Sequence, residues 1–459
     1  MPTILGANTL SSGYDVANSL RLNSADSARL TRTQTSGDRN KATFSAWVKR
    51  SKLGANQGFF GIHGASSDAG QIEIRFQSSG EGFHISGHAT NWRRTSASFR
   101  DVSAWYHLVV AFDTTLSTAG DRVKVYVNGV QTTAFAASGN PDEDEDLPFG
   151  LNGATCSVGS DFNAGSAGNF FGGYLAEVVL IDGQQLEPTS FGEFDEDSPT
   201  IWKPKDVSGL TFGNNGFYLD FEDSSSLGND AAGSNNFTAT NLAATDQSTD
   251  TCTNNFPTLN SLVKAPSSIT FSEGNLKAVH PGSWTGVPAT IGVQNGKWYW
   301  ECKVTTGNSA NAFTGICIED VNFNDSTVYN ETGLILYFVD GRKTVDGTDT
   351  ESFFTSLATN DIVGVALDLD SGTKTVTFTK NGSASGSAVN LTSNFDNKFI
   401  FPVGIGNSSS ATSNWEFNFG SPPYSISSGN SDANGHGNFE YSVPSGYFAL
   451  CTKNLAENG

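Results

Sequence analysis

One pattern occurs twice, and it constrains the fold more than any other feature of the sequence. The first copy is WYHLVVAFDTTLSTAGDRVKVYVNGVQ (residues 105–131), and the second is IVGVALDLDSGTKTVTFTKNGSAS (residues 362–385). Each runs through an apolar strand that ends in Asp, a polar turn, a second strand and Asn-Gly. Alternating apolar residues place one face of a strand in a core, and Asn-Gly supplies the positive φ angles of a tight hairpin. The repeat therefore predicts two units of similar antiparallel architecture.

The composition favours strands throughout the chain. The 459 residues include 50 glycines and a single methionine, with 37% hydrophobic and 16% charged residues. Such a mixture suits short strands joined by many turns. No stretch of ten residues carries a sustained helical apolar stripe. We therefore predict an all-β protein with two antiparallel β-sandwiches.

The charge balance excludes several classes of partner. There are 26 Lys and Arg against 47 Asp and Glu, a formal net charge of −21. This charge repels nucleic acid and anionic membranes, and no apolar run approaches the roughly 20 residues of a membrane span. The N-terminus lacks the basic region of a signal peptide. The five cysteines are scattered without a CxxC pair, which predicts free thiols and folding in a reducing cytoplasm.

Strand and turn signals divide the chain into segments. We predict an N-terminal arm (1–19), a first sandwich (20–200), an irregular connector (201–262), a second sandwich (263–425) and a C-terminal extension (426–459) that packs back. The Asn-, Ser- and Gly-rich connector is either a linker or a strap over neighbouring domains. Its aromatic residues favour the strap: Phe212, Phe217, Tyr218, Phe237 and Phe256.

Several motifs resemble known families. WYHLVVAFD, RVKVYVNG and GYLAEVVLIDGQQL, in this order, resemble the laminin-G-like branch of the concanavalin A-like sandwiches. GKWYWECKV, GICI, DIVGVALDLDSGTKTVTFTKNG, FPVGIG and NFG resemble a SPRY domain, another relative of that fold. The opening MPTILGANTL and the connecting FGEFDEDSPTIWKPKDVSGLTFGNNGFYLDFEDSSSLGND are similar to virion structural proteins of marine bacteriophages. Those proteins carry both kinds of module in fibres and other appendages, so the resemblance implies a phage particle protein.

Catalytic motifs are sparse. Glycosidases of this fold place paired carboxylates on one strand, but QIEIRFQ offers Glu73 alone. In LAEVVLID, Glu177 and Asp182 fall on opposite faces. The sequence has no nucleophile elbow, phosphate-binding loop or metalloprotease helix. We expect no enzymatic activity and no cofactor, with a polysaccharide depolymerase as the disfavoured alternative.

Two groups of residues are candidates for ligand binding. Aromatic rings in predicted loops could stack on sugars or anchor a protein, or else pack under their own loops. An acidic run could capture calcium, or else be a solvated loop. The aromatic candidates are Trp92, Trp284, Phe323 and Tyr329, and the acidic candidates are Asp142, Glu143, Asp144, Glu145 and Asp146.

The N-terminal arm is the predicted attachment element. It is too short for a core of its own, yet it carries more apolar residues than a solvated tail needs: Ile4, Leu5, Leu10, Tyr14 and Val16. We expect these residues to bind other virion proteins, and the chain to form a homo-oligomer, with a trimer favoured. The predicted function is a tail or capsid fibre or appendage, assembled in the host cytoplasm, that displays modules for a host-surface glycan or protein. The alternative is a capsid or tail decoration protein without a host ligand.

Overall fold

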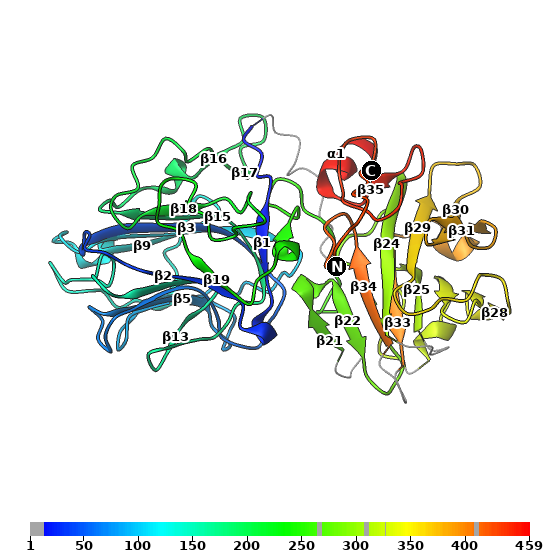
Figure 1. The fold of residues 1–459 in the computed structure, drawn as a ribbon, viewed down its shortest axis with the longest axis horizontal. Helices are drawn as coiled ribbons and strands as arrows, with labels where there is room; N and C mark the ends of the chain where they lie inside the picture. Colours follow the sequence, from blue (N-terminus) through cyan, green and yellow to red (C-terminus); the bar gives the residue numbers. More distant parts are fainter. Residues whose placement is uncertain (1–12, 264–268, 307–311, 326, 408–412) are drawn as a thin grey trace. The chain divides into compact units, whose positions relative to one another are not determined.

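The structure is a computed structural model that describes residues 13–263, 269–306, 312–325, 327–407 and 413–459. The chain divides between Thr253 and Asn254 into two compact units built almost wholly of strands (Figure 1). Among the described residues the only α-helix is α1 (Thr452–Asn458), and no helix there is long and apolar enough to cross a membrane. The all-β prediction is confirmed.

The first unit is a sandwich of two sheets. One sheet has the order β10 (Val130–Gln131), β9 (Val123–Val127), β8 (Trp105–Asp113), β3 (Lys41–Arg50), β15 (Gly173–Asp182), β1 (Ser19–Leu22) and β20 (Gln247–Ser248), with β18 (Phe217–Leu219) also on β15. The other has the order β11 (Phe135–Ala137), β7 (Asn91–Thr95), β6 (Phe83–Ser86), β5 (Gln71–Phe76), β4 (Gln57–His63), β12 (Thr155–Val158), β2 (Arg29–Thr33) and β19 (Thr238–Thr240). Two hairpins add β13 (Asp161–Asn163) with β14 (Ser166–Gly168), and β16 (Gly192–Phe194) with β17 (Trp202–Pro204).

The core of this sandwich follows the alternation of its strands. In β5, Ile72, Ile74 and Phe76 are fully buried in the core, so the residues between them face outward. Across the sandwich, Phe44 of β3 stacks on Phe60 of β4 with ring centroids 4.4 Å apart. Packing of the core therefore fixes the position of the outward-facing side chains of β5.

The connector belongs to the first unit. Its strands extend both sheets, because β18 pairs with β15, β20 with β1 and β19 with β2. Phe217 and Phe237 are buried with their ring edges in contact at 4.8 Å. The compact unit therefore runs to Thr253 and does not end near residue 200. Strands of two or three residues are too short to show an alternating pattern in the sequence.

Buried polar contacts fasten the connector to the outer face of β3 and β8. Lys49 Nζ lies 2.6 Å from a carboxylate oxygen of Asp250, and both side chains are almost completely buried. Trp202 Nε1 donates to His107 Nδ1 at 2.9 Å, while the other ring nitrogen of His107 lies 2.9 Å from Ser45 Oγ. Burial lowers the pKa of His107 to about 3, so this ring is neutral and can accept the tryptophan proton.

Part of the predicted attachment arm packs against its own chain. Val16 is buried beside Trp47 and Trp202, and its amide donates to Thr253 Oγ1 at 3.1 Å. The Tyr14 hydroxyl lies 2.8 Å from the Tyr218 hydroxyl. The connector therefore covers Val16, which leaves it little surface for another virion protein, whereas Tyr14 is half-buried and its role in attachment stays a prediction.

The remaining apolar residues predicted for the arm are Ile4, Leu5 and Leu10, and they lie outside the described residues.

Glu177 is a buried carboxyl at an irregularity of β15. It has a φ of 50°, where the register with β3 shifts between Ala176 and Val179. The Tyr218 hydroxyl lies 2.9 and 3.0 Å from its two oxygens. Burial raises the pKa of Glu177 from 4.5 to about 8, with the tyrosine hydrogen bonds opposing the shift. Glu177 is therefore mostly protonated at neutral pH.

This carboxyl predicts a pH dependence of stability. A folded-state pKa above the unfolded value makes the free energy of unfolding fall as pH rises from about 4.5 through about 8. Glu177→Gln keeps the shape of the protonated acid and should remove this part of the fall. One pKa unit corresponds to about 1.4 kcal/mol, so the variant should be more stable than the wild type by roughly 2–4 kcal/mol at pH 9 and equally stable at pH 4. Urea unfolding at both pH values measures the difference, and a constant offset would contradict the assignment.

The second unit is also a sandwich. One sheet has the order β21 (Thr270–Ser272), β22 (Lys277–His280), β34 (Ser413–Asn418), β24 (Lys297–Thr306), β29 (Ile362–Asp368), β30 (Thr375–Lys380) and β31 (Ser383–Ala384), with β32 (Val389–Asn390) on β30 and β35 (Phe448–Ala449) on β24. The other has the order β23 (Thr285–Pro288), β33 (Ile400–Gly406), β25 (Ala312–Ile318), β26 (Leu334–Phe338), β27 (Lys343–Val345) and β28 (Thr348–Thr350). Trp298, Trp300 and Trp415 are completely buried in its core.

The C-terminal extension lies on this second sandwich. Strand β35 pairs in parallel with β24. The buried carboxylate of Glu301 accepts the backbone N–H of Tyr441 at 2.8 Å and that of Glu440 at 3.0 Å. Tyr299 and Asn418 also donate to this buried acid, so both of its oxygens are hydrogen-bonded. All five cysteines of the chain are free thiols, and Thr314 Oγ1 donates to Cys302 Sγ at 3.1 Å.

The two Asn-Gly turns have the same structure. Asn128 and Asn381 have a φ of 48°, and the glycine after each also has a positive φ. In both turns the asparagine Oδ1 accepts a hydrogen bond from a backbone N–H near the start of the first strand of the repeat. The donor is His107 at 2.8 Å in one copy and Ile362 at 2.9 Å in the other. The sequence repeat is therefore a structural repeat.

An aromatic ring covers each turn glycine. A Cβ on Gly129 would collide with the ring of Trp202, and a Cβ on Gly382 would lie 2.6 Å from the ring of Tyr441. In each unit this ring comes from beyond the end that the sequence predicted for the sandwich, residue 200 or residue 425. Glycine is thus required at each turn for two reasons, the positive φ and the close approach of the ring.

Candidate functional site

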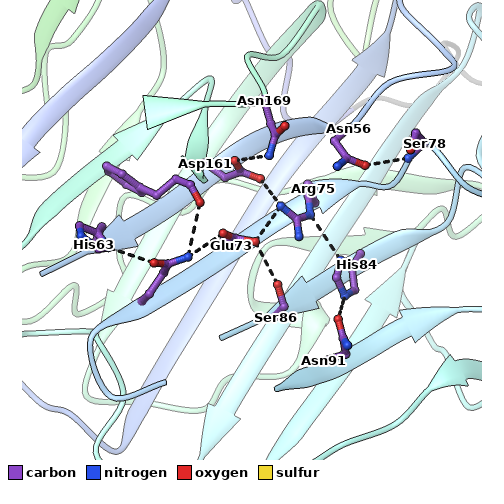
Figure 2. Close-up of polar contacts among 12 residues, drawn as sticks. Asn56, His63, Glu73, Arg75, Ser78, His84, Ser86, Asn91, Asp161 and Asn169 are labelled. Carbon is purple, nitrogen blue, oxygen red and sulfur yellow. Dashed lines mark hydrogen bonds and ion pairs between the residues drawn. The ribbon is translucent and has the colours of Figure 1, made fainter. Parts of the chain in front are cut away.

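Polar side chains gather on the outer face of β4, β5 and β6. On β5, Gln71, Glu73 and Arg75 alternate with the core residues. Figure 2 shows their contacts with residues of the neighbouring strands and of the β13–β14 hairpin. We call this set the polar face; its members are His63, Gln71, Glu73, Arg75, His84, Ser86, Asn91, Asp161 and Asn169.

Two carboxylates of the polar face share one arginine. Arg75 Nη1 lies 2.7 Å from Glu73 Oε2 and 3.0 Å from Asp161 Oδ2 (Figure 2). Asp161 begins the β13–β14 hairpin, which approaches β4 so closely that a Cβ on Gly58 would lie 2.6 Å from the aspartate side chain. Sequence reasoning identified Glu73 and missed Asp161. The only sequence signal of this contact was the pair of glycines in QGFFGIH, which leave room for the hairpin.

Neutral side chains hold both carboxylates in place. Gln71 Nε2 donates to Glu73 Oε1 at 2.7 Å, and Ser86 Oγ donates to Glu73 Oε2 at 3.2 Å. Asn169 Nδ2 donates to Asp161 Oδ1 at 2.8 Å. Every carboxylate oxygen of the pair therefore accepts at least one hydrogen bond, which fixes the geometry of the face.

Burial controls the protonation of the polar face. It raises the pKa of Asp161 to about 7, while the charge of Arg75 opposes the shift. Burial, helped by the charge of Arg75, lowers the pKa of His84 to about 4. His84 is thus neutral: Nδ1 accepts from Arg75 Nε at 3.4 Å, and Nε2 donates to Asn91 Oδ1 at 2.8 Å. At neutral pH the charge of Arg75 is balanced by the carboxyl groups beside it, so the face carries little net charge and many fixed dipoles.

Some polar atoms of the face have no protein partner. Within the described residues, Arg75 Nη2 makes no hydrogen bond, and neither does Nε2 of His63. The Asn91 side chain is exposed at the edge of the face. A ligand with several hydroxyl groups could therefore find both donors and acceptors here.

Two of the four aromatic candidates are buried. Trp92 lies in strand β7 and not in a loop, and its fully buried ring packs edge-on against Phe112 at 5.9 Å. Phe323 is 5% exposed and covers Gly286, where a Cβ would lie 2.8 Å from its ring. The prediction of exposed binding rings is wrong for both, because each ring fills a gap in its own sandwich.

The other two aromatic candidates lie together. Trp284 and Tyr329 are half-buried, with ring centroids 4.3 Å apart. Trp284 also stacks on Phe313 of β25 at 5.0 Å, which fixes the orientation of the indole. We call Trp284 and Tyr329 the aromatic pair of the second sandwich. These two residues are 45 positions apart in the sequence. The sequence gave no signal of their contact, because it arises from the packing of two separate segments.

The acidic run does not form a metal site. Asp146 pairs with Arg39 at 2.9 Å, and Glu143 pairs with Arg122 at 3.3 Å. Across the described parts of the chain, no three His, Cys, Asp or Glu side chains are grouped so that they could hold a metal ion. The structure therefore does not bring the five predicted calcium ligands, Asp142 to Asp146, together as a metal site. Arginines engage Glu143 and Asp146, and a backbone amide donates to Glu145.

Comparison with known families identifies the class of each unit. Residues 22–187 match a family model described as the concanavalin A-like lectin/glucanases superfamily, of the Laminin_G_3 type. Residues 297–421 match the SPRY domain. The chain therefore contains a laminin-G-like, concanavalin A-like domain followed by a SPRY domain, as the sequence motifs predicted. These are lectin-like and SPRY domains of kinds that bind carbohydrate or protein.

Solved structures similar to the chain include a SPRY domain, a pentraxin and a candidate carbohydrate binding protein. The SPRY domain of human HERC1 is 17% identical, covering 35% of this chain and 96% of its own, with a TM-score of 0.29. A heptameric SAP-like pentraxin from Limulus polyphemus is 16% identical, covering 38% of this chain and 80% of its own, with a TM-score of 0.29. A candidate carbohydrate binding protein from Bacteroides ovatus is 14% identical, covering 50% of this chain and 61% of its own, with a TM-score of 0.35. No curated protein matches the chain.

Proposed function

We propose that the chain is a non-enzymatic structural protein of a phage virion, which displays a lectin-like and a SPRY module toward a host-surface glycan or protein. The two domain matches support a binding role. The resemblance of the opening and connecting segments to virion proteins of marine phages supports a place in a tail or capsid fibre or appendage. We further propose that it binds other virion proteins and forms a homo-oligomer, with a trimer favoured.

The position of Arg75 favours binding over hydrolysis. Glycosidases need two carboxyl groups that flank the scissile bond, with room for the sugar or a water molecule between them. Here one guanidinium nitrogen pairs with both Glu73 and Asp161. Arg75 therefore occupies the space between the two carboxyl groups where the sugar or the water molecule would have to lie. The polar face instead offers fixed hydrogen-bonding groups to a hydroxylated ligand.

The aromatic pair is the contact surface that we propose for the SPRY module. Half-buried rings with a fixed orientation bind partners at a small cost in side-chain entropy. The Trp284 ring packs against both Phe313 and Tyr329. This surface suits a protein loop or the apolar face of a sugar ring.

A particle-binding and cell-binding experiment tests the proposal. Antibodies against the chain should label purified virions, and the purified protein should bind host cells. Periodate treatment of the cells should abolish binding if the ligand is a glycan, and protease treatment should abolish it if the ligand is a protein. Tyr329→Ala should weaken binding about tenfold, and Tyr329→Phe, which keeps the ring, should not.

Three results would contradict parts of this proposal. Labelled virions together with a protein that binds no host cell would favour the decoration role. That role is the second candidate because the carboxylates of the polar face are already satisfied within the protein. Release of reducing ends from host polysaccharide would show a depolymerase. Unlabelled virions would exclude the structural role.

A further inference from the structure

A pocket lies at one end of the first sandwich, apart from the polar face and the aromatic pair. It has a volume of about 340 Å³ and is lined by residues of β7, β9, β10 and β11 and of adjacent segments. These strands form the same end of both sheets, so the pocket opens between the sheet edges. Its volume is at the lower end of the range of small-molecule sites.

Arg93 supplies a fixed positive charge to this pocket. The residue is 4% exposed. Its terminal nitrogens donate to the carbonyl oxygens of Trp92 at 2.7 Å, of Gly120 at 3.2 Å and of Gly139, and to Asn140 Oδ1 at 2.8 Å. All of these acceptors are neutral. Within the described residues no carboxylate forms an ion pair with Arg93.

A buried charge without a counter-ion is unusual. Buried charges in proteins are ordinarily paired, because removal from water costs several kcal/mol for each ion. Burial alone lowers the pKa of Arg93, and no neighbouring acid opposes this shift. The guanidinium also lies 5.3 Å from the ring centroid of Phe135, which lines the same pocket. The pocket therefore holds a positive charge whose partner the described chain does not provide.

Further groups in the pocket suit a polar ligand. Lys124 adds a second cation, and its Nζ lies 3.7 Å from the exposed carboxylate of Glu187. Four lining side chains make no hydrogen bond within the described parts of the chain: Gln131, Thr132, Thr133 and Ser138. Hydroxyl and amide groups of this kind pair with the hydroxyl groups of a sugar.

We propose that this pocket binds a single acidic sugar residue, with its carboxylate or sulfate near the positive charges of Arg93 and Lys124 and its hydroxyl groups near the threonine and serine side chains. The net charge of −21 disfavours a polyanion at long range. A ligand with one anionic group meets the local cations without that penalty. This site is independent of the polar face and the aromatic pair, so it can fail while the proposed function stands.

Calorimetric titration of the full chain tests the ligand class. The probes are glucuronic acid, glucose 6-sulfate and glucose at low ionic strength and pH 7. At least one charged sugar should bind ten or more times tighter than glucose, which corresponds to about 1.4 kcal/mol. The two charged probes distinguish a carboxylate site from a sulfate site. Equal affinity for all three sugars, or no binding of either charged sugar, would overturn the proposal.

A matched pair of variants tests the location. Ser138 is exposed at the pocket wall, so substitutions there should leave the fold intact. Ser138→Asp places a negative charge in the pocket and should weaken binding of the charged sugar at least about tenfold. Ser138→Asn has a similar size without charge and should change it less than about threefold. Equal effects of the two variants would place the charged sugar elsewhere and overturn the assignment. Arg93 is not suitable for this test, because its hydrogen bonds hold two loops.

Discussion

A fragment of residues 13–200 should be unfolded, whereas a fragment of residues 13–253 should unfold cooperatively as a single domain. The shorter fragment lacks β18, β19 and β20, which extend both sheets. It also lacks the buried side chains of Phe217, Leu219 and Phe237. Each such side chain contributes about 1.5–3 kcal/mol when fully buried. Their sum is comparable to the whole stability of a typical domain, about 5–15 kcal/mol.

Loss of the connector also uncovers charged and polar groups. Without Asp250 the buried ammonium of Lys49 has lost its carboxylate, and without Trp202 the imidazole of His107 has lost its donor. Thermal unfolding followed by circular dichroism compares the two fragments, and the variant Asp250→Ala in the longer fragment isolates the contribution of the ion pair. A cooperative transition of the 13–200 fragment at the temperature of the longer one would show that the connector does not belong to the domain.

Arg75→Met should destabilise the first domain by about 3–5 kcal/mol at pH 8, the usual cost of removing one partner from a buried ion pair. The substitution leaves Glu73 and Asp161 facing each other without a cation. The pKa of Asp161 must then rise further, because burial already raises it and the charge of Arg75 no longer opposes that shift. Protonation relieves the repulsion, so the destabilisation should decrease as pH falls from 8 to 5.

A neighbouring arginine provides the control. Arg94 on β7 donates to the neutral Gln77 at 3.0 Å and holds no carboxylate of the polar face. Arg94→Met should therefore cost less than about 1 kcal/mol at either pH, as surface substitutions usually do. Urea unfolding at pH 5 and pH 8 measures all three proteins. An equal loss for Arg75→Met at the two pH values would mean that packing of the side chain, and not charge, dominates.

Short-range sequence patterns predicted the strands and turns that depend only on neighbouring residues. The alternation of QIEIRF placed Glu73 and Arg75 on one face of β5, and the Asn-Gly pairs predicted both turns with their positive φ angles. The connector was harder to interpret, because its strands are two or three residues long and gain their partners only from the finished sheets. Polar neighbours made NWRRT resemble a loop, whereas pairing with β6 and β11 makes it a strand with Trp92 inside.

The candidate site depended even more on tertiary structure. Asp161 contacts Arg75 because a hairpin packs over the glycines of β4. No periodicity in the sequence indicates that packing. Trp284 and Tyr329 are likewise brought together by separate loops. The composition of the acidic run suggested a calcium site, but arginines elsewhere in the sequence form ion pairs with Glu143 and Asp146.

The aromatic rings over the two Asn-Gly turns set the length of chain that each module needs to be complete. Trp202 lies beyond the last residue of the laminin-G-like match, and Tyr441 lies beyond the last residue of the SPRY match. A recombination event that cut the gene just after residue 187 would deliver a sandwich without the ring that covers its own turn. A crossover at the junction of Thr253 and Asn254 would transmit each module with its cover. In genomes that exchange such cassettes, breakpoints should therefore collect at this junction and not at the borders of the matched domains.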